Sequence, residues 1–273
     1  MARAIRSHRA AVANPRGATA PRRIAGRLFF GLAATLYAAF SPPASAQVPP
    51  PVDVALVLAV DASGSIDAEE FKLQKEGIAL ALLDPTVQRA IRNGPNRRIA
   101  VAYVEWGTPG APAVVVDWML VGAEASARAF GAALLAAPRS PQSYNAIGDA
   151  VVLGLALIRV CPCRPARAVI DVSGDNRDMR SLVPALVARE QAMRDGVTVN
   201  ALAILQDGAV GASGKALLVE NYEREVIAGP GAFVQVAEDR ASFGRAIRRK
   251  MALEISGLPS GADLASSESV RGD

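Results

Sequence analysis

Val54–Ser65 of this chain reads VALVLAVDASGS, a sequence that changes character halfway along. Its first seven residues are all apolar, which is typical of a strand buried on both faces, as in a parallel sheet. The second half, DASGS, places a carboxylate and two hydroxyls at alternating positions. Open α/β sheets bind ligands at the carboxyl ends of their strands, and hard oxygen donors suit Mg²⁺ or a similar cation. The stretch therefore predicts a buried strand that ends in a cation site.

The D-x-S-x-S motif of Asp61, Ser63 and Ser65 resembles the metal-ion-dependent adhesion site (MIDAS) of the von Willebrand factor type A (vWA) family. A simpler alternative is a Ser/Gly turn whose hydroxyls only cap the next helix. That helix is expected from Asp67, because Asp67 and Glu70 have the spacing of a capping box.

The first 46 residues have the pattern of an export signal. Residues 1–27 contain seven arginines and no acid, residues 28–40 are largely apolar, and Ala44-Ser45-Ala46 resembles a cleavage site. The apolar run is shorter than a membrane span requires. We therefore expect a signal peptide over residues 1–46 and a periplasmic or secreted protein, with Sec and twin-arginine export both open.

Removal of this leader changes the charge of the protein. The full chain carries 30 basic and 26 acidic residues, whereas the part after the leader carries 23 and 26, a formal net charge of −3. The basic pI therefore belongs to the leader and does not indicate nucleic-acid binding. The chain's single histidine, His8, also lies in the leader. Its loss excludes Ser-His-Asp and Cys-His catalysis in the mature protein.

The rest of the chain is expected to form one α/β domain over residues 47–256, followed by a disordered tail over residues 257–273. The expected strands are 54–60, 98–105, 113–120, 167–172, 198–205 and 232–236. The expected helices are 67–83, 123–136, 145–159, 181–195, 214–223 and 240–255.

The spacing of these elements predicts the topology of the sheet. The gap between the second and third strands is too short for a helical crossover, so these strands should form an antiparallel hairpin. Strands and helices then alternate. We expect a doubly wound, Rossmann-like sheet, mostly parallel with one antiparallel edge strand and with helices on both faces. This matches the vWA arrangement, and the resemblance covers nearly all of residues 52–255.

Two later loops correspond to the remaining parts of the vWA metal site. In the family one loop supplies a threonine, commonly as T-x-I-G; here Asn145-Ala146-Ile147-Gly148 places asparagine at that position. An asparagine carbonyl can ligate a hard cation, but Asn145 alone is also a good helix N-cap. Ser143 or Tyr144 could supply the missing hydroxyl. The other loop, Ser173-Gly174-Asp175, carries Asp175 where the family has its loop aspartate.

The resemblance implies a metal site of Asp61, Ser63, Ser65, Asn145 and Asp175 that holds Mg²⁺, or Mn²⁺ or Ca²⁺ in its place. By the same resemblance, an acidic side chain of a protein partner would complete the coordination. Few carboxylates would touch the ion, so it would keep enough positive charge to attract an external one.

Four further polar residues have more ordinary interpretations. Asp171 lies within a predicted strand and is expected to accept hydrogen bonds in the core. Asp178 is expected to be a capping or surface residue rather than a ligand. Cys161 and Cys163 are expected to form a local disulfide or to be two free thiols, because a zinc site would need further Cys or His ligands.

The sequence is compatible with three functions. The first is a binding module that engages a protein through a divalent cation. The second is a metal-free vWA-like interaction domain in which Asn145 has disabled the site. The third is a phosphotransferase or hydrolase that uses Asp61 as nucleophile; such enzymes usually carry a second aspartate two residues on, where this chain has Ser63. We therefore expect a protein that is not an enzyme.

Overall fold

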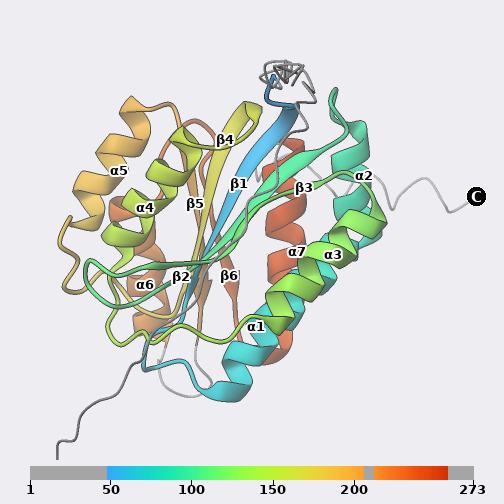
Figure 1. Cartoon of the computed structure of the whole chain (residues 1–273). Helices are drawn as coiled ribbons and strands as arrows, with labels where there is room; N and C mark the ends of the chain where they lie inside the picture. The colour runs from blue at the N-terminus through green and yellow to red at the C-terminus, as the bar shows by residue number, and fades with distance from the viewer. Residues whose placement is uncertain (1–47, 206–211, 258–273) are drawn as a thin grey trace, which may run out of the picture. The chain divides into compact units, whose positions relative to one another are not determined.

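The computed structural model describes residues 48–205 and 212–257 (Figure 1). The expected signal peptide and, apart from Gly257, the expected tail lie outside the described residues. None of the described helices is both long enough and apolar enough to span a bilayer.

Six strands form one sheet in the described chain, and the predicted topology is confirmed. The spatial order is β3-β2-β1-β4-β5-β6; β3 is antiparallel to β2, and all other neighbours are parallel. The strands are β1 (Pro51–Asp61), β2 (Ile99–Trp106), β3 (Ala113–Val121), β4 (Arg164–Gly174), β5 (Thr198–Ile204) and β6 (Val234–Ala237).

Helices cover both faces of the sheet (Figure 1). One face carries α1 (Ala68–Leu83), α2 (Pro85–Asn93), α3 (Glu124–Ala136) and α7 (Arg240–Ser256). The other carries α4 (Ile147–Arg159), α5 (Ala185–Arg194) and α6 (Ala212–Glu225). The three-layer arrangement explains the apolar run of β1: Leu58 belongs to the buried cluster that contains Ile78 and Ile247 on one face, and Val57 to the cluster that contains Ile147 on the other.

One helix was not predicted. The helix expected over residues 67–83 ends at Leu83, but the Asp84-Pro85 pair that follows it begins a further helix, α2. Asp84 accepts a hydrogen bond from the Thr86 amide at 2.8 Å, and Pro85 occupies the first helical turn, where its missing N–H leaves no hydrogen bond unmade. The pair therefore separates two helices rather than a helix and a loop.

Several predicted boundaries were also wrong. The helix expected from residue 145 begins at Ile147, and the one expected from residue 181 begins at Ala185. The strand expected over residues 167–172 extends over Arg164–Gly174, because the Arg164 amide donates to the Pro50 carbonyl at 2.9 Å and continues the pairing with β1.

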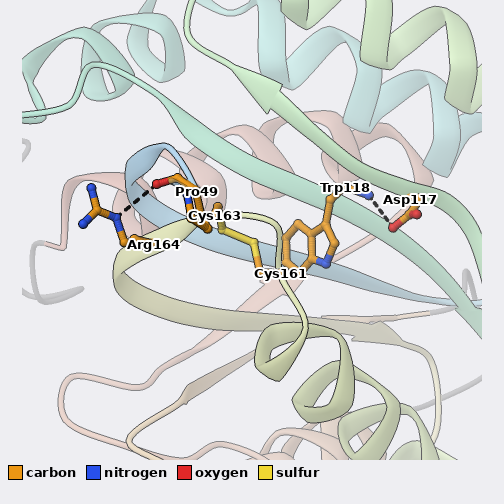
Figure 2. The surroundings of a disulfide bond; sticks show 6 residues. All are labelled: Pro49, Asp117, Trp118, Cys161, Cys163 and Arg164. Atoms are coloured by element: carbon orange, nitrogen blue, oxygen red, sulfur yellow. Dashed lines mark hydrogen bonds between the residues drawn. A yellow bond between two sulfur atoms is a disulfide. The ribbon is translucent and has the colours of Figure 1, made fainter. Parts of the chain in front are cut away.

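Cys161 and Cys163 form a disulfide at the turn between α4 and β4. Figure 2 shows this bond beside the indole ring of Trp118, which packs with both cysteines in a small apolar cluster. Nearby, Arg164 Nε donates to the Pro49 carbonyl at 3.0 Å. Of the two expected alternatives, the structure thus has the disulfide, and it lies at the amino end of β4.

A buried ion cluster joins α7 to the sheet. Lys250 Nζ lies 2.5 Å from both Asp171 Oδ1 and Glu254 Oε1, and all three side chains are buried. Asn200 also donates to Glu254 at 3.0 Å. Burial, together with the charge of Asp171, raises the pKa of Glu254 to about 8. Asp171 is therefore a core acceptor, as expected.

Candidate metal centre

Three loops meet at the carboxyl ends of β1 and β4, at the lower end of the sheet in Figure 1. They connect β1 to α1, α3 to α4, and β4 to α5. The Gly64 amide donates to the Ser143 carbonyl at 3.2 Å, which joins the first two loops, and the Met179 amide donates to the Asn145 carbonyl at 2.6 Å, which joins the second and third. The loops that carry the predicted ligands therefore lie together.

Four of the five predicted ligands form one hydrogen-bonded chain. Asp61 Oδ1 accepts from the Ser63 amide at 2.8 Å, and the Ser63 and Ser65 hydroxyls are 3.0 Å apart. Ser65 in turn donates to Asp175 Oδ1 at 3.2 Å. Asp61 and Ser63 are fully buried, whereas Ser65 is exposed and Asp175 is half-buried. These four side chains, called the oxygen cluster below, are therefore buried at the Asp61 and Ser63 end and accessible to a ligand at the Ser65 and Asp175 end.

Asp61 has a strongly perturbed ionisation. Burial, together with the charge of the nearby Asp175 carboxylate, raises its pKa to about 8, although hydrogen bonds from Ser63 act in the opposite direction. Its second carboxylate oxygen, Oδ2, is buried and has no hydrogen-bond partner in the described chain. A buried carboxylate oxygen without a donor is costly unless a proton or a cation neutralises it.

The fifth predicted ligand, Asn145, lies beside this chain rather than in it. It is not the N-cap of α4, since that position is Ala146. Its side chain is buried, with 5% exposed, and its Oδ1 atom has no hydrogen-bond partner among the described residues. The capping interpretation of Asn145 is therefore wrong, and the loop contains a second buried oxygen without a donor.

The two other hydroxyls of this loop have different surroundings. The Ser143 hydroxyl is 3.2 Å from the hydroxyl of Thr108, and Tyr144 is exposed, with the guanidinium of Arg180 4.7 Å from its ring centre. Neither hydroxyl hydrogen-bonds to the Asp61–Asp175 chain. In this loop Asn145 Oδ1 is therefore the buried side-chain oxygen that accepts no hydrogen bond from a described residue.

Two glycines let the loops approach closely. A Cβ at Gly107, just after β2, would lie 2.7 Å from the Tyr144 carbonyl and 3.2 Å from Ser63 Cα. A Cβ at Gly148 would lie only 1.9 Å from the Val183 carbonyl. The glycine after Ala146-Ile147 is therefore required because the first turn of α4 contacts the loop that precedes α5.

Arg139 fixes the shape of the loop that carries Ser63 and Ser65. Its Nη2 atom donates to the carbonyls of Ala62, Ser63 and Ile66 at 2.8 to 2.9 Å. Its guanidinium also lies 4.5 Å from the centre of the Phe71 ring. Motif comparison did not identify Arg139, because an arginine in a loop far along the chain gives no local signal of such contacts.

The loop from β4 to α5 is anchored by Asp178 and Tyr222. The Asp178 carboxylate accepts from the amides of Ile147 and Gly148 at 2.9 and 3.2 Å and from that of Ala185 at 3.0 Å. It thereby caps α4 and α5 together, as its expected capping role required. Tyr222 is buried and donates to the Asn176 carbonyl at 2.9 Å, and burial raises its pKa well above the usual range.

The residues present fit a hard divalent cation. Two hydroxyls, two carboxylates and one amide oxygen are the donors that Mg²⁺, Mn²⁺ and Ca²⁺ prefer. No group of three or more His, Cys, Asp or Glu residues in the described ranges could hold a metal, so a cation here would depend on hydroxyl and amide oxygens as well. The two buried oxygens without donors, on Asp61 and Asn145, are those that such an ion would satisfy.

A cleft of about 520 Å³ opens beside the oxygen cluster. Ser65, Asp175 and Arg177 line one part of it, and Leu217 and Asn221 of α6 line another. The cleft gives a ligand larger than an ion access to Ser65 and Asp175.

The sequence matches the model of a family described as "Protein of unknown function (DUF1194)" over residues 51–259. No curated protein matches it significantly. The match covers every described strand and helix.

Solved structures with the same fold include vWA domains and adhesins. The pilus adhesin SpaC from Lactobacillus rhamnosus GG is 17% identical, with 76% of this chain and 31% of that chain covered and a TM-score of 0.53. The proximal thread matrix protein 1 of the mussel byssus is 15% identical, with coverage of 75% and 47% and a TM-score of 0.53. One structure of that mussel protein has zinc in its MIDAS motif.

A von Willebrand factor type A protein from Catenulispora acidiphila is 16% identical, with coverage of 75% and 43% and a TM-score of 0.51. The chain thus spans less than half the length of each of these three structures. At such low identity the likeness concerns the fold. The chain belongs to the DUF1194 family of proteins of unknown function, and its fold is that of a vWA domain.

Proposed function

We propose that this protein is a binding module that holds a divalent cation with Asp61, Ser63, Ser65, Asn145 and Asp175 and engages a protein partner there. Mg²⁺ is the expected ion, with Mn²⁺ or Ca²⁺ as substitutes. The observation that carries the proposal is the buried Asp61 carboxylate, which has one oxygen without a donor beside the Ser63–Ser65–Asp175 chain.

The residues of the site have different roles. Asp61 and Asp175 supply negative charge, and the two serines supply neutral oxygens. A bound divalent cation would supply positive charge and an open coordination position for an acidic side chain of the partner. Arg139 and Asp178 hold the loops in place, so little ordering is required when a ligand binds.

The zinc-occupied MIDAS of the mussel protein supports a divalent ion at this place in the fold, and the adhesin SpaC supports a role in protein binding. The first 46 residues have the pattern of a signal peptide, and an exported protein is consistent with both metal binding and protein binding. We accordingly place the mature protein in the periplasm or outside the cell, without catalytic activity of its own.

Thermal melts test the metal site. At a Mg²⁺ or Mn²⁺ concentration 100 times the dissociation constant, binding would stabilise the fold by about 2.7 kcal/mol, or roughly 5–10 °C for a domain of this size. Chelator should remove the shift, and Ser63→Ala or Asp175→Asn should abolish it. Asp195→Asn, a matched change at the C-terminal end of α5, should keep it. Identical melts of the wild-type protein with metal and with chelator would leave the metal-free alternative as the better account.

A further inference from the structure

Beside the candidate metal centre, an arginine is stacked on a tyrosine; these two residues and Arg177 are called the rim below. Arg180 lies over the ring of Tyr144 at 4.7 Å, and both residues are exposed. Tyr144 directly precedes Asn145, so the pair lies beside one of the proposed ligands. Stacking on the ring restricts the long arginine side chain before any ligand binds, which lowers the entropy lost on binding.

The backbone of Arg180 has an unusual conformation. Its φ angle is +66°, in the left-handed region that side chains other than glycine, asparagine and aspartate rarely adopt. Such a conformation is strained and persists only when the surrounding structure holds it in place. Neighbouring Met179 is fixed by its 2.6 Å hydrogen bond to the Asn145 carbonyl, so the turn that presents Arg180 is tied to the site.

A second exposed arginine, Arg177, belongs to the same loop between β4 and α5 as Arg180. Arg177 lines the 520 Å³ cleft together with Ser65 and Asp175. Neither Arg177 nor Arg180 forms an ion pair with a described residue, although other surface arginines do, such as Arg128 with Glu124. In the same loop, Asp175 accepts a hydrogen bond from the Ser65 hydroxyl, and Asp178 accepts from backbone amides. Two guanidinium groups thus remain available around the site.

We propose that Arg177 and the Tyr144–Arg180 pair form an anion-binding rim that recognises a second acidic residue of the partner, beside the one bound at the metal. This inference rests on the proposed function and adds a requirement to it: the partner segment is an acidic peptide with at least two carboxylates. Exposed apolar side chains next to the rim, Leu182 at 73% and Leu217 at 58%, suit the non-polar residues of such a segment.

An acidic protein segment fits this rim better than a nucleic acid does. The part of the chain after the leader has a formal net charge of −3, and nucleic-acid sites require broad basic surfaces. Two arginines beside two aspartates instead match a short segment with carboxylates at defined spacing.

Fluorescence anisotropy with synthetic peptides tests the rim. The probes are labelled Gly/Ser peptides that carry no glutamate, one glutamate, or two glutamates separated by one to five residues, in Mg²⁺. The best two-glutamate peptide should bind about tenfold more tightly than the one-glutamate peptide, because its second carboxylate gains contacts with the guanidinium groups of Arg177 and Arg180. Arg177→Gln/Arg180→Gln should reduce that preference to less than about twofold. The matched control Arg128→Gln/Arg194→Gln, on exposed helix surfaces, should keep it.

The Mg²⁺-dependent thermal shift of the rim variant separates the two proposals. The variant should keep the wild-type shift, because neither arginine is a proposed ligand. A normal shift with an unchanged two-glutamate preference in the variant would overturn the rim, and so would a normal shift with no binding of any peptide. Equal binding of a single-stranded oligonucleotide would overturn the acidic-peptide assignment. If Mg²⁺ gives no thermal shift in the wild-type protein, the metal site itself is refuted.

Discussion

Arg139→Ala should loosen the loop that presents Ser63 and Ser65. The substitution removes hydrogen bonds to the carbonyls of Ala62, Ser63 and Ile66 and the contact with Phe71. One Nη2 atom carries two N–H groups, so at most two of the three bonds have full strength at one time. Hydrogen bonds from a charged group contribute about 1.5–3 kcal/mol each, and water can reach the half-buried loop after truncation. We expect a loss of about 2–4 kcal/mol in the free energy of unfolding.

That loss corresponds to a fall in melting temperature of roughly 5–15 °C for a domain of this size. Residues that orient ligands typically change metal affinity by about 10- to 100-fold when removed, so the Mn²⁺ dissociation constant measured by calorimetry should rise at least about tenfold. Arg139→Lys keeps the charge but not the planar donor group and should be intermediate. Arg128→Ala, whose partner is the exposed Glu124, should change neither quantity. Arg139→Ala with unchanged melting and unchanged Mn²⁺ affinity would refute the reasoning.

Three other predictions concern the buried core and the loops around the site. Burial raises the pKa of Glu254 to about 8, so its ionisation destabilises the fold and stability should fall as the pH rises from roughly pH 5 to pH 8; urea titrations should show a smaller fall in Glu254→Gln, with the contribution of Asp61 remaining. Asp178→Ala leaves the first amides of two helices without their acceptor, and chemical denaturation should show a loss of about 2 kcal/mol or more; a loss under 0.5 kcal/mol would contradict the shared cap. Gly148→Ala should lower the melting temperature markedly because its Cβ would lie 1.9 Å from the Val183 carbonyl, whereas Gly244→Ala, with open space around it, should be neutral or stabilising.

Patterns that depend on neighbouring residues predicted the fold well. The uninterrupted apolar run of β1 indicates burial on both faces, and the short segment between β2 and β3 permits only a hairpin. The helix α2 was not predicted, because a proline after Asp84 can either end a helix or begin the next one, and only the residues after Pro85 distinguish a loop from a second helix.

The parts of the site that were not predicted depend on contacts distant in sequence. The N-terminus of α4 is capped by Asp178, 31 positions further on than Ile147, so the helix begins after Asn145 rather than at it. Arg139 reaches carbonyls more than 70 positions earlier in the chain. Such contacts leave no periodicity or motif in the sequence. The D-x-S-x-S motif, by contrast, is local, so Asp61, Ser63 and Ser65 can be proposed as ligands from the sequence alone.

The central claim is that Asp61, Ser63, Ser65, Asn145 and Asp175 bind a divalent cation together. The most direct test is anomalous diffraction from crystals of the mature protein grown with Mn²⁺. Our account predicts one strong anomalous peak within about 2.0–2.6 Å of several of these oxygen atoms, as expected for a hard cation, with Asn145 Oδ1 contributing directly or through a water molecule. The absence of a peak at the carboxyl end of β1, while Mn²⁺ is present in excess, would contradict the account.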